Sequence, residues 1–279
     1  MKTQNQANHY KWLIPSGRLA PEPELWEEHE DYKANVFSLT CDPSLCETLI
    51  AGIPDSSKTR ILIPGCGSLI ELQKKLLEAC PNIGQVCCTD FSSKAIERAE
   101  ASWLQYAVQS NLSSNPVSFE KLDSTQLTEL KPDWRNQFDY VLVVNSVLSS
   151  KDKDNRKMLG EFYKALKPGG KLYGLFPTVF CGLEIAYLIK DKAHWLIDGN
   201  INLSYSAFYE EKQNRHQIFY TPLRLNRIFK ETGFKRLNFE VYFCDSKYFN
   251  TKDIYGYDEP DICVWEFLVR LEKEKTQYG

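Results

Sequence analysis

The stretch that decides the fold is Ile61-Leu62-Ile63-Pro64-Gly65-Cys66-Gly67-Ser68. Its three large apolar residues predict a buried β-strand, and the glycines that follow predict a tight turn. Apolar residues then recur at helical spacing from Leu69 to Cys80, so a helix follows the turn. Glycines at a strand-to-helix turn let backbone amides approach a ligand closely. The stretch therefore predicts a ligand-binding turn, although an ordinary connection that needs positive φ would use the same glycines.

The alternation of strand and helix continues along the chain. Further strands are expected at Val86–Cys88, Val117–Leu122, Phe138–Val144, Lys171–Phe176, Phe234–Phe243 and Ile262–Leu271. Further helices are expected at Ser93–Ser110, Asn155–Leu166 and Pro222–Thr232, the last of them stopped by Gly233. Strands that are separated by helices pair in parallel. The pattern predicts a doubly wound α/β fold with a seven-stranded, mostly parallel, Rossmann-like sheet.

Two segments stand apart from this alternation. Residues 1–57 combine a polar arm with two expected helices, at Glu24–Phe37 and at Pro43–Ala51, the second capped by Asp42. Residues 177–220 lose their periodicity over a length too great for a simple connection. We therefore expect an N-terminal arm and helical cap at 1–57 and a ligand-binding domain at 58–279, with a substrate-cap insertion at 177–220.

The composition argues against several kinds of partner. The formal net charge is -3 and the pI about 5.9, which gives no general attraction to nucleic acid or to an anionic membrane. No apolar run approaches the roughly 20 residues of a membrane span. The nine cysteines are an odd number and include the adjacent Cys87 and Cys88, as is typical of reduced core thiols. We expect a cytoplasmic protein, either a monomer or a homodimer, that binds neither nucleic acid nor a membrane.

An acidic residue, Asp90, ends the strand that follows the glycine turn. In nucleotide-binding α/β folds a carboxylate at about this spacing reaches the ribose hydroxyls. Asp90 could instead cap the next helix, although Ser92 or Ser93 could also do so. The dinucleotide pattern requires a third glycine where this chain has Ile70. That difference argues against NAD or FAD and is neutral for a ligand without phosphate.

Five segments resemble the class I S-adenosylmethionine-dependent methyltransferases, in the order of that family. They are Ile61–Ser68, Thr89–Phe91, Leu122–Ser124, Phe138–Leu148 and Leu166–Leu172. The resemblance covers about residues 58–176, and the Leu-Lys-Pro-Gly-Gly turn is its most specific part. It implies that S-adenosyl-L-methionine is the cofactor and that 58–279 is a methyltransferase domain. The Pro-Gly-Cys-Gly version of the turn is similar to small-molecule subfamilies such as thiol and halide methyltransferases.

The resemblance also implies roles for single residues. Gly65 and Gly67 would face the methionine and ribose portions of the cofactor. Asp90 would bind the ribose hydroxyls, and Phe91 would cover one face of the adenine. The usual acidic residue before the glycine turn is absent, because the strand reads Arg-Ile-Leu-Ile-Pro. The full set expected to bind the cofactor is Pro64, Gly65, Cys66, Gly67, Asp90, Phe91, Asp123, Ser124 and Asn145.

Two later residues in this set have ordinary alternatives. Asp123 would bind the adenine amino group, with Ser124 beside it, or would be a simple loop carboxylate. Asn145 would lie near the departing methyl group, or would only form the turn that ends its strand. Because methyl transfer from a sulfonium is a direct displacement, positioning matters most and a base is needed only for some acceptors. The expected catalytic residues are Tyr32 and Asn145, and the lack of clustered ligand motifs predicts no metal site.

The acceptor is expected to be a small molecule bound at the carboxyl ends of the strands. The residues expected to contact it are Glu28, Tyr32, Phe176, Tyr205 and Tyr209. The acidic run from Glu22 to Asp31 favours N-methylation of an amine or guanidino metabolite, although such a run could also be a solvated helix face. Alternatives are O- or S-methylation, a protein acceptor, an NAD-dependent oxidoreductase, or a non-catalytic subunit that binds S-adenosylmethionine.

Overall fold

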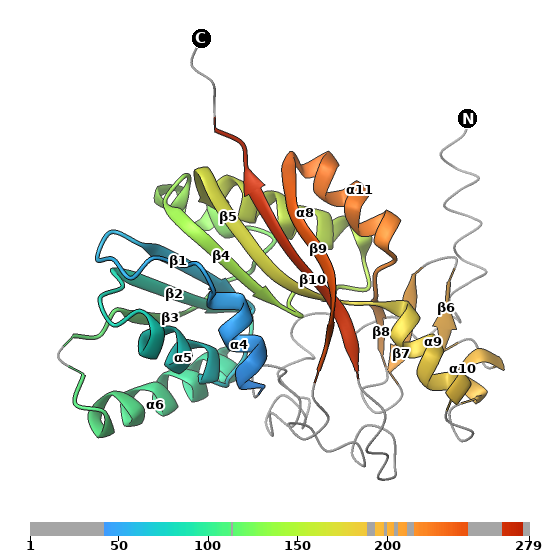
Figure 1. The fold of residues 1–279 in the computed structure, drawn as a ribbon, viewed down its shortest axis with the longest axis horizontal. Helices are drawn as coiled ribbons and strands as arrows, with labels where there is room; N and C mark the ends of the chain where they lie inside the picture. Colours follow the sequence, from blue (N-terminus) through green and yellow to red (C-terminus); the bar gives the residue numbers. More distant parts are fainter. Residues whose placement is uncertain are drawn as a thin grey trace.

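A seven-stranded sheet is the centre of the molecule in the computed structural model (Figure 1). The structure describes residues 42–112, 114–188, 193–197, 200–203, 206–210, 215–244 and 264–275. The helix expected at Glu24–Phe37 lies outside these residues. Within them, none of the helices combines the length and the apolar character that crossing a bilayer requires.

The sheet has the strand order β3-β2-β1-β4-β5-β10-β9. Neighbouring strands from β3 to β5 pair in parallel, whereas β10 pairs antiparallel with both β5 and β9. The predicted mostly parallel, seven-stranded sheet is therefore confirmed. Its strands are β1 (Arg60–Pro64), β2 (Gln85–Asp90), β3 (Val117–Lys121), β4 (Phe138–Val144), β5 (Leu166–Pro177), β9 (Phe234–Phe243) and β10 (Trp265–Lys273).

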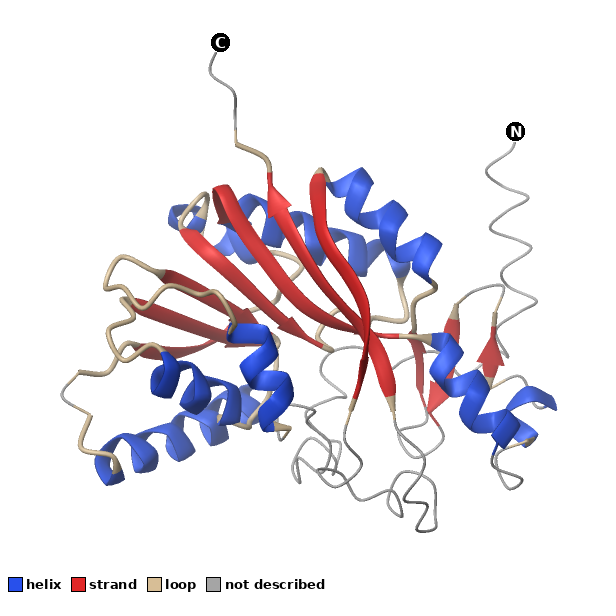
Figure 2. Cartoon of the chain, viewed as in Figure 1, coloured by secondary structure: helices blue, strands red, loops and turns tan. Residues whose placement is uncertain are grey.

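Helices cover both faces of the sheet (Figure 2). One face carries α4 (Pro43–Ile50), α5 (Glu71–Ala79) and α6 (Ser93–Gln109). The other carries α7 (Leu127–Leu130), the 3-10 turn η2 (Pro132–Trp134), α8 (Asp152–Ala165) and α11 (Pro222–Thr232). The predicted ends of two helices are confirmed, since the Asp42 carboxylate accepts a hydrogen bond from the Ser44 amide and Gly233 has a φ of 97°.

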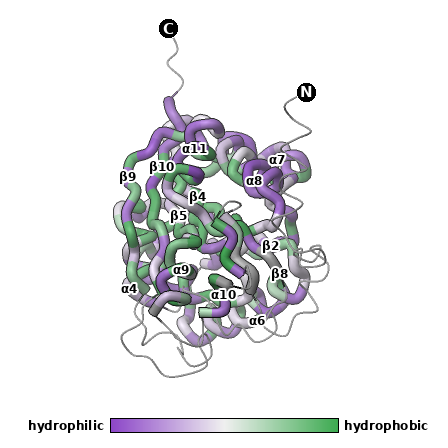
Figure 3. The backbone as a smooth tube through the Cα atoms, turned by 90° about the vertical axis from the view of Figure 1, so that its right-hand side faces the viewer, coloured by the Kyte–Doolittle hydropathy of each residue, from purple (hydrophilic) through white to green (hydrophobic). Residues whose placement is uncertain are grey.

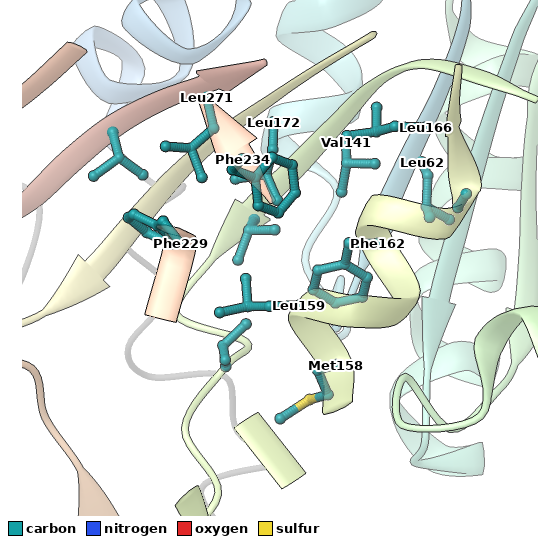
Figure 4. Packing of buried hydrophobic residues seen from close by; sticks show 14 of the residues in the cluster. Leu62, Val141, Met158, Leu159, Phe162, Leu166, Leu172, Phe229, Phe234 and Leu271 are labelled. Carbon is teal, nitrogen blue, oxygen red and sulfur yellow. The ribbon is translucent and has the colours of Figure 1, made fainter. Parts of the chain in front are cut away.

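Strand β1 shows how the sequence builds two cores. Ile61 and Ile63 point to the face of α4, α5 and α6, while Leu62 points to the face of α8 and α11, because successive side chains of a strand alternate. In the second core, Leu62 and Val141 from the sheet pack with Phe162 of α8 (Figure 4). Hydrophilic residues predominate along α8, as expected for a helix that buries one side only (Figure 3).

The segment 177–220 has elements of its own. They are α9 (Val179–Leu188), α10 (His194–Ile197), β6 (Ile201–Asn202), β7 (Ala207–Glu210) and β8 (Arg215–Ile218), and the three strands form a separate small sheet. A third cluster, which includes Val179, Ile185 and Trp195, packs this segment. The sequence pattern did not reveal α9, because its residues are almost all apolar and leave no polar stripe from which a helical period can be read.

Candidate functional site

The predicted glycine turn lies at the carboxyl end of β1, and its two glycines differ in what surrounds them. Gly65 has a φ of 63° and Gly67 a φ of 64°, a region that L side chains rarely adopt. A Cβ atom on Gly65 would lie 2.3 Å from the Cβ of Ser146, but one on Gly67 would meet no atom of the described residues within 4 Å. Gly65 thus allows the turn after β4 to approach closely, while Gly67 leaves its backbone open.

Asp90 joins this turn to the end of β2. Its carboxylate is 1% exposed and accepts hydrogen bonds from the Gly67 amide, at 3.0 Å, and from the Ser92 amide, at 2.9 Å. The hydroxyl of Ser92 accepts from the Ala95 amide and is the N-cap of α6. The structure therefore assigns the helix cap to Ser92 and leaves Asp90 to position the glycine turn.

The end of β3 lies beside Asp90. The Leu122 amide donates to the Asp90 carbonyl at 2.8 Å, so Asp123 follows directly from the strand that pairs with β2. The Asp123 carboxylate accepts from the Thr125 amide at 2.8 Å and from the Gln126 side chain at 3.2 Å. The structure thus brings Asp90, Asp123 and the glycine turn to one edge of the sheet, while the predicted adenine contact of Asp123 remains a prediction.

Cys66 stands between the two glycines. Its amide donates to the Thr89 carbonyl at 2.9 Å, and its side chain is partly buried. The neighbouring Cys88 thiol and burial both raise the pKa of the Cys66 thiol well above its usual range. Cys66 is therefore a neutral thiol at physiological pH, which suits packing beneath the turn rather than nucleophilic attack.

A polar pair lies where β4 ends. Asn145 adopts a φ of 48°, and its side-chain amide donates to the Glu266 carboxylate at 3.0 Å. Glu266 comes from β10 and is 5% exposed. Burial raises the pKa of its carboxyl to about 8, an effect that the hydrogen bond from Asn145 partly offsets. The sequence analysis missed Glu266, although a single carboxylate inside the apolar run Val264–Val269 was a signal that could have revealed it.

Several buried polar atoms near these residues have no hydrogen-bond partner among the described residues. Three of them, Glu266 Oε2, Asn145 Oδ1 and Ser146 Oγ, belong to the cluster at the end of β4. Others, namely Ser68 Oγ, Gln73 Oε1 and Thr89 Oγ1, come from the glycine turn, the start of α5 and the end of β2. Because buried polar groups are nearly always satisfied, these atoms mark places where a ligand or water would bind.

Of the remaining predicted site residues, most lie outside the described part of the chain and one is buried in the core. Glu28, Tyr32 and Tyr205 lie outside the described residues, and so does the side chain of Tyr209, whose backbone lies in β7. Phe176 was expected in the substrate wall, but it is 1% exposed and packs edge-on against the rings of Tyr220 and Phe229. Its ring therefore supports the end of β5 from within the core.

Tyr220 connects the 177–220 segment to the cluster at the end of β4. It is fully buried, and its hydroxyl donates to the Val147 carbonyl at 2.7 Å. Its backbone also pairs with β5, because the Tyr220 amide donates to the Pro177 carbonyl at 2.8 Å. The segment is thus anchored at its C-terminal end to the same turn that carries Asn145 and Ser146.

Two other features bear on the chemistry. Among the described residues, no group of three or more His, Cys, Asp and Glu side chains could hold a metal ion. A cavity of about 290 Å³ lies between α5 and α6 and is lined by residues that include Ser68, Lys74 and Tyr106. It adjoins the glycine turn, but neither Asp90 nor Asn145 lines it, so it is distinct from the edge of the sheet described above.

Comparison with solved structures agrees with this geometry at the level of the fold. A SAM-dependent methyltransferase from Methanosarcina mazei is 19% identical, with a TM-score of 0.57 over 80% of this chain and 95% of its own. A methyltransferase solved with the Haloferax volcanii activator Trm112 is 14% identical, with a TM-score of 0.57 over 92% and 97%. The N-methyltransferase NodS from Bradyrhizobium japonicum is 15% identical, with a TM-score of 0.50 over 83% and 85%.

The sequence itself points to the same family. Among curated proteins none matches the chain, but residues 64–172 match the family model of a methyltransferase domain. That match begins at the glycine turn, ends in β5 and includes Asp90, Asp123 and Asn145. It confirms the resemblance noted in the sequence, and it implies S-adenosylmethionine as the cofactor. Residues 64–172 of the chain therefore match a methyltransferase domain, in agreement with the resemblance to the class I S-adenosylmethionine-dependent methyltransferases.

Proposed function

We propose that this protein transfers the methyl group of S-adenosylmethionine to a basic nitrogen, an amine or a guanidino group, of a small molecule. The observation that carries the proposal is the Asp90 carboxylate, buried at the end of β2 and hydrogen-bonded to the Gly67 amide of the glycine turn. This places an acidic acceptor and an open backbone turn side by side, which is the combination that a ribose and its neighbouring groups require.

The described residues fit this cofactor. The open space beside Gly67 leaves room for close approach to the backbone, and the Ser68 hydroxyl is buried with no partner among the described residues. Asp90 would hold the ribose hydroxyls, and Asp123 would hold the adenine amino group beside it. Pro64, Gly65 and Cys66 would form the floor of the site, with Phe91 and Ser124 at its rim. When bound, the cofactor supplies an electrophilic methyl group on a sulfonium sulfur.

The protein's own contribution is positioning. Ser146 packs against Gly65, so the turn after β4 is held against the glycine turn. Asn145 precedes Ser146 and presents its side chain at the same edge of the sheet. Residues that hold two reactants in line can supply a large part of the rate enhancement, because they remove the entropy cost of bringing them together. In this account Asn145 orients the acceptor, and Tyr32 remains a candidate from the N-terminal segment.

A basic nitrogen is favoured as the acceptor because the end of β4 is rich in acceptor atoms. Among the described residues, the Glu266 and Asn145 oxygens there lack hydrogen-bond donors. An ammonium or guanidinium group brings several donors, whereas a carboxylate or phosphate brings none. Its nitrogen must give up one proton, to the Glu266 carboxylate or to water, before its lone pair can attack the methyl carbon. The carbon–sulfur bond then breaks, and S-adenosylhomocysteine is the leaving group. The substrate-cap role of 177–220 is part of the same proposal, since Tyr220 anchors that segment to Val147, two residues after Asn145.

The proposal is tested by calorimetric titration with S-adenosylhomocysteine and, separately, with NADH. We expect S-adenosylhomocysteine to bind and NADH to give no signal. Asp90→Ala should weaken S-adenosylhomocysteine binding by about ten-fold or more, the effect of losing a charge-assisted hydrogen bond. Asp133→Ala, which removes an exposed carboxylate on η2, is the matched control and should leave the affinity unchanged.

The acceptor is tested with purified protein, S-adenosylmethionine and a panel of small amines, guanidines, phenols and thiols, followed by mass spectrometry of the products. Methylated amines or guanidines would support the proposal. Turnover of phenols or thiols alone would refute the choice of nitrogen, and binding of NADH in place of S-adenosylhomocysteine would refute methyl transfer as a whole.

A further inference from the structure

The Glu266 carboxylate occupies an unusual position in the sheet. On β10 it lies directly opposite Pro177 of β5 and Tyr242 of β9. Residues that are directly opposite in antiparallel strands share a face, and the Tyr242 hydroxyl donates to Asp42, the N-cap of α4. Glu266 therefore lies on the face that α4 covers, level with the carboxyl end of β5.

The Glu266 carboxylate is almost fully buried, but only one of its two oxygens has a hydrogen-bond partner among the described residues. It is 5% exposed, and one oxygen accepts from Asn145 while the other has no partner among the described residues. None of the described residues forms an ion pair with Glu266, and none shifts its pKa through a charge–charge interaction. A buried carboxylate without a cation is costly, and carboxyl groups in such surroundings cluster at functional sites.

The neighbouring atoms define the chemistry that would complete it. Because the Asn145 amide nitrogen already donates to Glu266, its oxygen is left as a second acceptor, and the Ser146 hydroxyl adds a third polar group. A ligand that satisfies the two oxygens must donate more than one hydrogen bond. A positive charge on that ligand would also offset part of the cost of burying the ionised carboxylate.

The cluster of Glu266, Asn145 and Ser146 also contacts the glycine turn, which is proposed to bind the cofactor. Ser146 is the residue that the Gly65 backbone touches, and Asn145 is its chain neighbour. The path from the glycine turn to Glu266 thus runs through two adjacent residues. A group bound by Glu266 would lie on the side of Asn145 away from β1.

We propose that Glu266 is the residue that binds the basic nitrogen of the acceptor, through its unpartnered oxygen, and that Asn145 is the positioning residue that orients the carboxylate. This inference rests on the proposed function and adds the residue that selects the acceptor. The raised pKa of Glu266 agrees with it, because an ammonium or guanidinium partner would be the group that stabilises the ionised form.

The experiment uses the full chain saturated with S-adenosylhomocysteine and four small probes, so that its readout is binding rather than turnover. Propylamine is paired with propan-1-ol, and propylguanidine with propylurea, because each pair differs mainly in charge. Ligand-observed NMR titrations should show that the amine or the guanidine binds at least about ten-fold more tightly than its neutral match. Equal binding within both pairs would overturn the inference.

A variant tests the residue directly. Glu266→Gln keeps the oxygen that accepts from Asn145 and should abolish the preference for the charged probe, while its affinity for S-adenosylhomocysteine stays within two-fold, or about 0.4 kcal/mol, of the wild type. Glu240→Gln, an exposed change on the adjacent β9, is the control and should keep the preference. A Glu266→Gln chain that retains the preference would refute the assignment.

The two proposals fail in different ways. If S-adenosylhomocysteine does not bind, the proposed function is wrong. If it binds and the charged probes show no preference, the role of Glu266 is wrong, while binding of the cofactor and methyl transfer still stand. The comparison of charged with neutral probes needs the wild-type chain alone, so it decides the question even if Glu266→Gln does not fold.

Discussion

The side-chain amide of Asn145 donates a hydrogen bond of 3.0 Å to the carboxylate of Glu266, across 121 positions of sequence. The contact joins the end of a parallel strand, β4, to the antiparallel strand β10, although β5 lies between them in the sheet. One residue supplies the donor and the other a buried carboxyl, so each depends on the other for its place at the site.

Glu266 should make the stability of the protein depend on pH. Burial raises its pKa to about 8, so between about pH 4.5 and 8 the folded chain keeps a proton that the unfolded chain has lost. The free energy of unfolding therefore falls as pH rises through this window, by about 1.4 kcal/mol per pH unit from this group. Urea denaturation of Glu266→Gln between pH 5.5 and 7.5 should show a shallower fall, and parallel curves would contradict the prediction.

The two glycines of the turn should differ in their tolerance of alanine. Gly67→Ala meets open space, so it should cost only the strain of a positive φ, about 1–2 kcal/mol. Gly65→Ala carries the same strain and also forces Ser146 to move, which should cost about 1–3 kcal/mol more. Chemical denaturation of both variants checks this order, and Ser146→Gly should restore part of the stability of Gly65→Ala but none of that of Gly67→Ala.

Asp90 should matter for folding as well as for binding. Asp90→Ala leaves the amides of Gly67 and Ser92 without their acceptor, which should lower the free energy of unfolding by about 2–4 kcal/mol. Asp90→Asn keeps one acceptor oxygen and should lose less. Thermal unfolding of both variants measures the difference, and equal losses would show that the two hydrogen bonds do not act separately.

The Tyr220 hydroxyl should be a measurable anchor of the 177–220 segment. Tyr220→Phe leaves the Val147 carbonyl without its donor and should cost about 1–3 kcal/mol. Limited proteolysis should then cut the segment faster than in the wild type. Tyr187→Phe changes a residue that is 83% exposed and is the control. Equal cleavage rates in the two variants would mean that the hydroxyl does not hold the segment.

Much of the fold could be predicted because local pattern and tertiary structure agree. The strand Phe138–Val144, the helix Pro222–Thr232 and the strand Phe234–Phe243 have the predicted bounds. The boundary between α8 and β5 was placed less well. The strand begins at Leu166 rather than Lys171, because its first residues pair with β4 across a register shift that no local signal marks.

The arrangement of the glycine turn and Asp90 was more predictable than the contact between Asn145 and Glu266. Gly65, Gly67 and Asp90 lie in short motifs whose spacing along the chain determines their spacing in space. The pairing of Asn145 with Glu266 depends on where β10 enters the sheet, which periodicity cannot tell. The placement of Phe176 in the substrate wall could not be decided from the sequence for a related reason. An aromatic residue at the end of a strand can face either the ligand or the core, and Phe176 packs in the core.

The position of β10 also has a consequence for the newly made chain. β9 precedes β10 in sequence, yet it reaches the sheet only by pairing with β10. As the polypeptide leaves the ribosome, β1 to β5 can already associate, while β9 emerges with no docked strand to receive it. Strand β5 then remains an unpaired edge strand, and the side chain of Asn145 has no contact with Glu266. Both contacts form only when β10 pairs with β5. A nascent chain that ends between β9 and β10 would therefore contain the glycine turn, Asp90 and Asn145 but not Glu266.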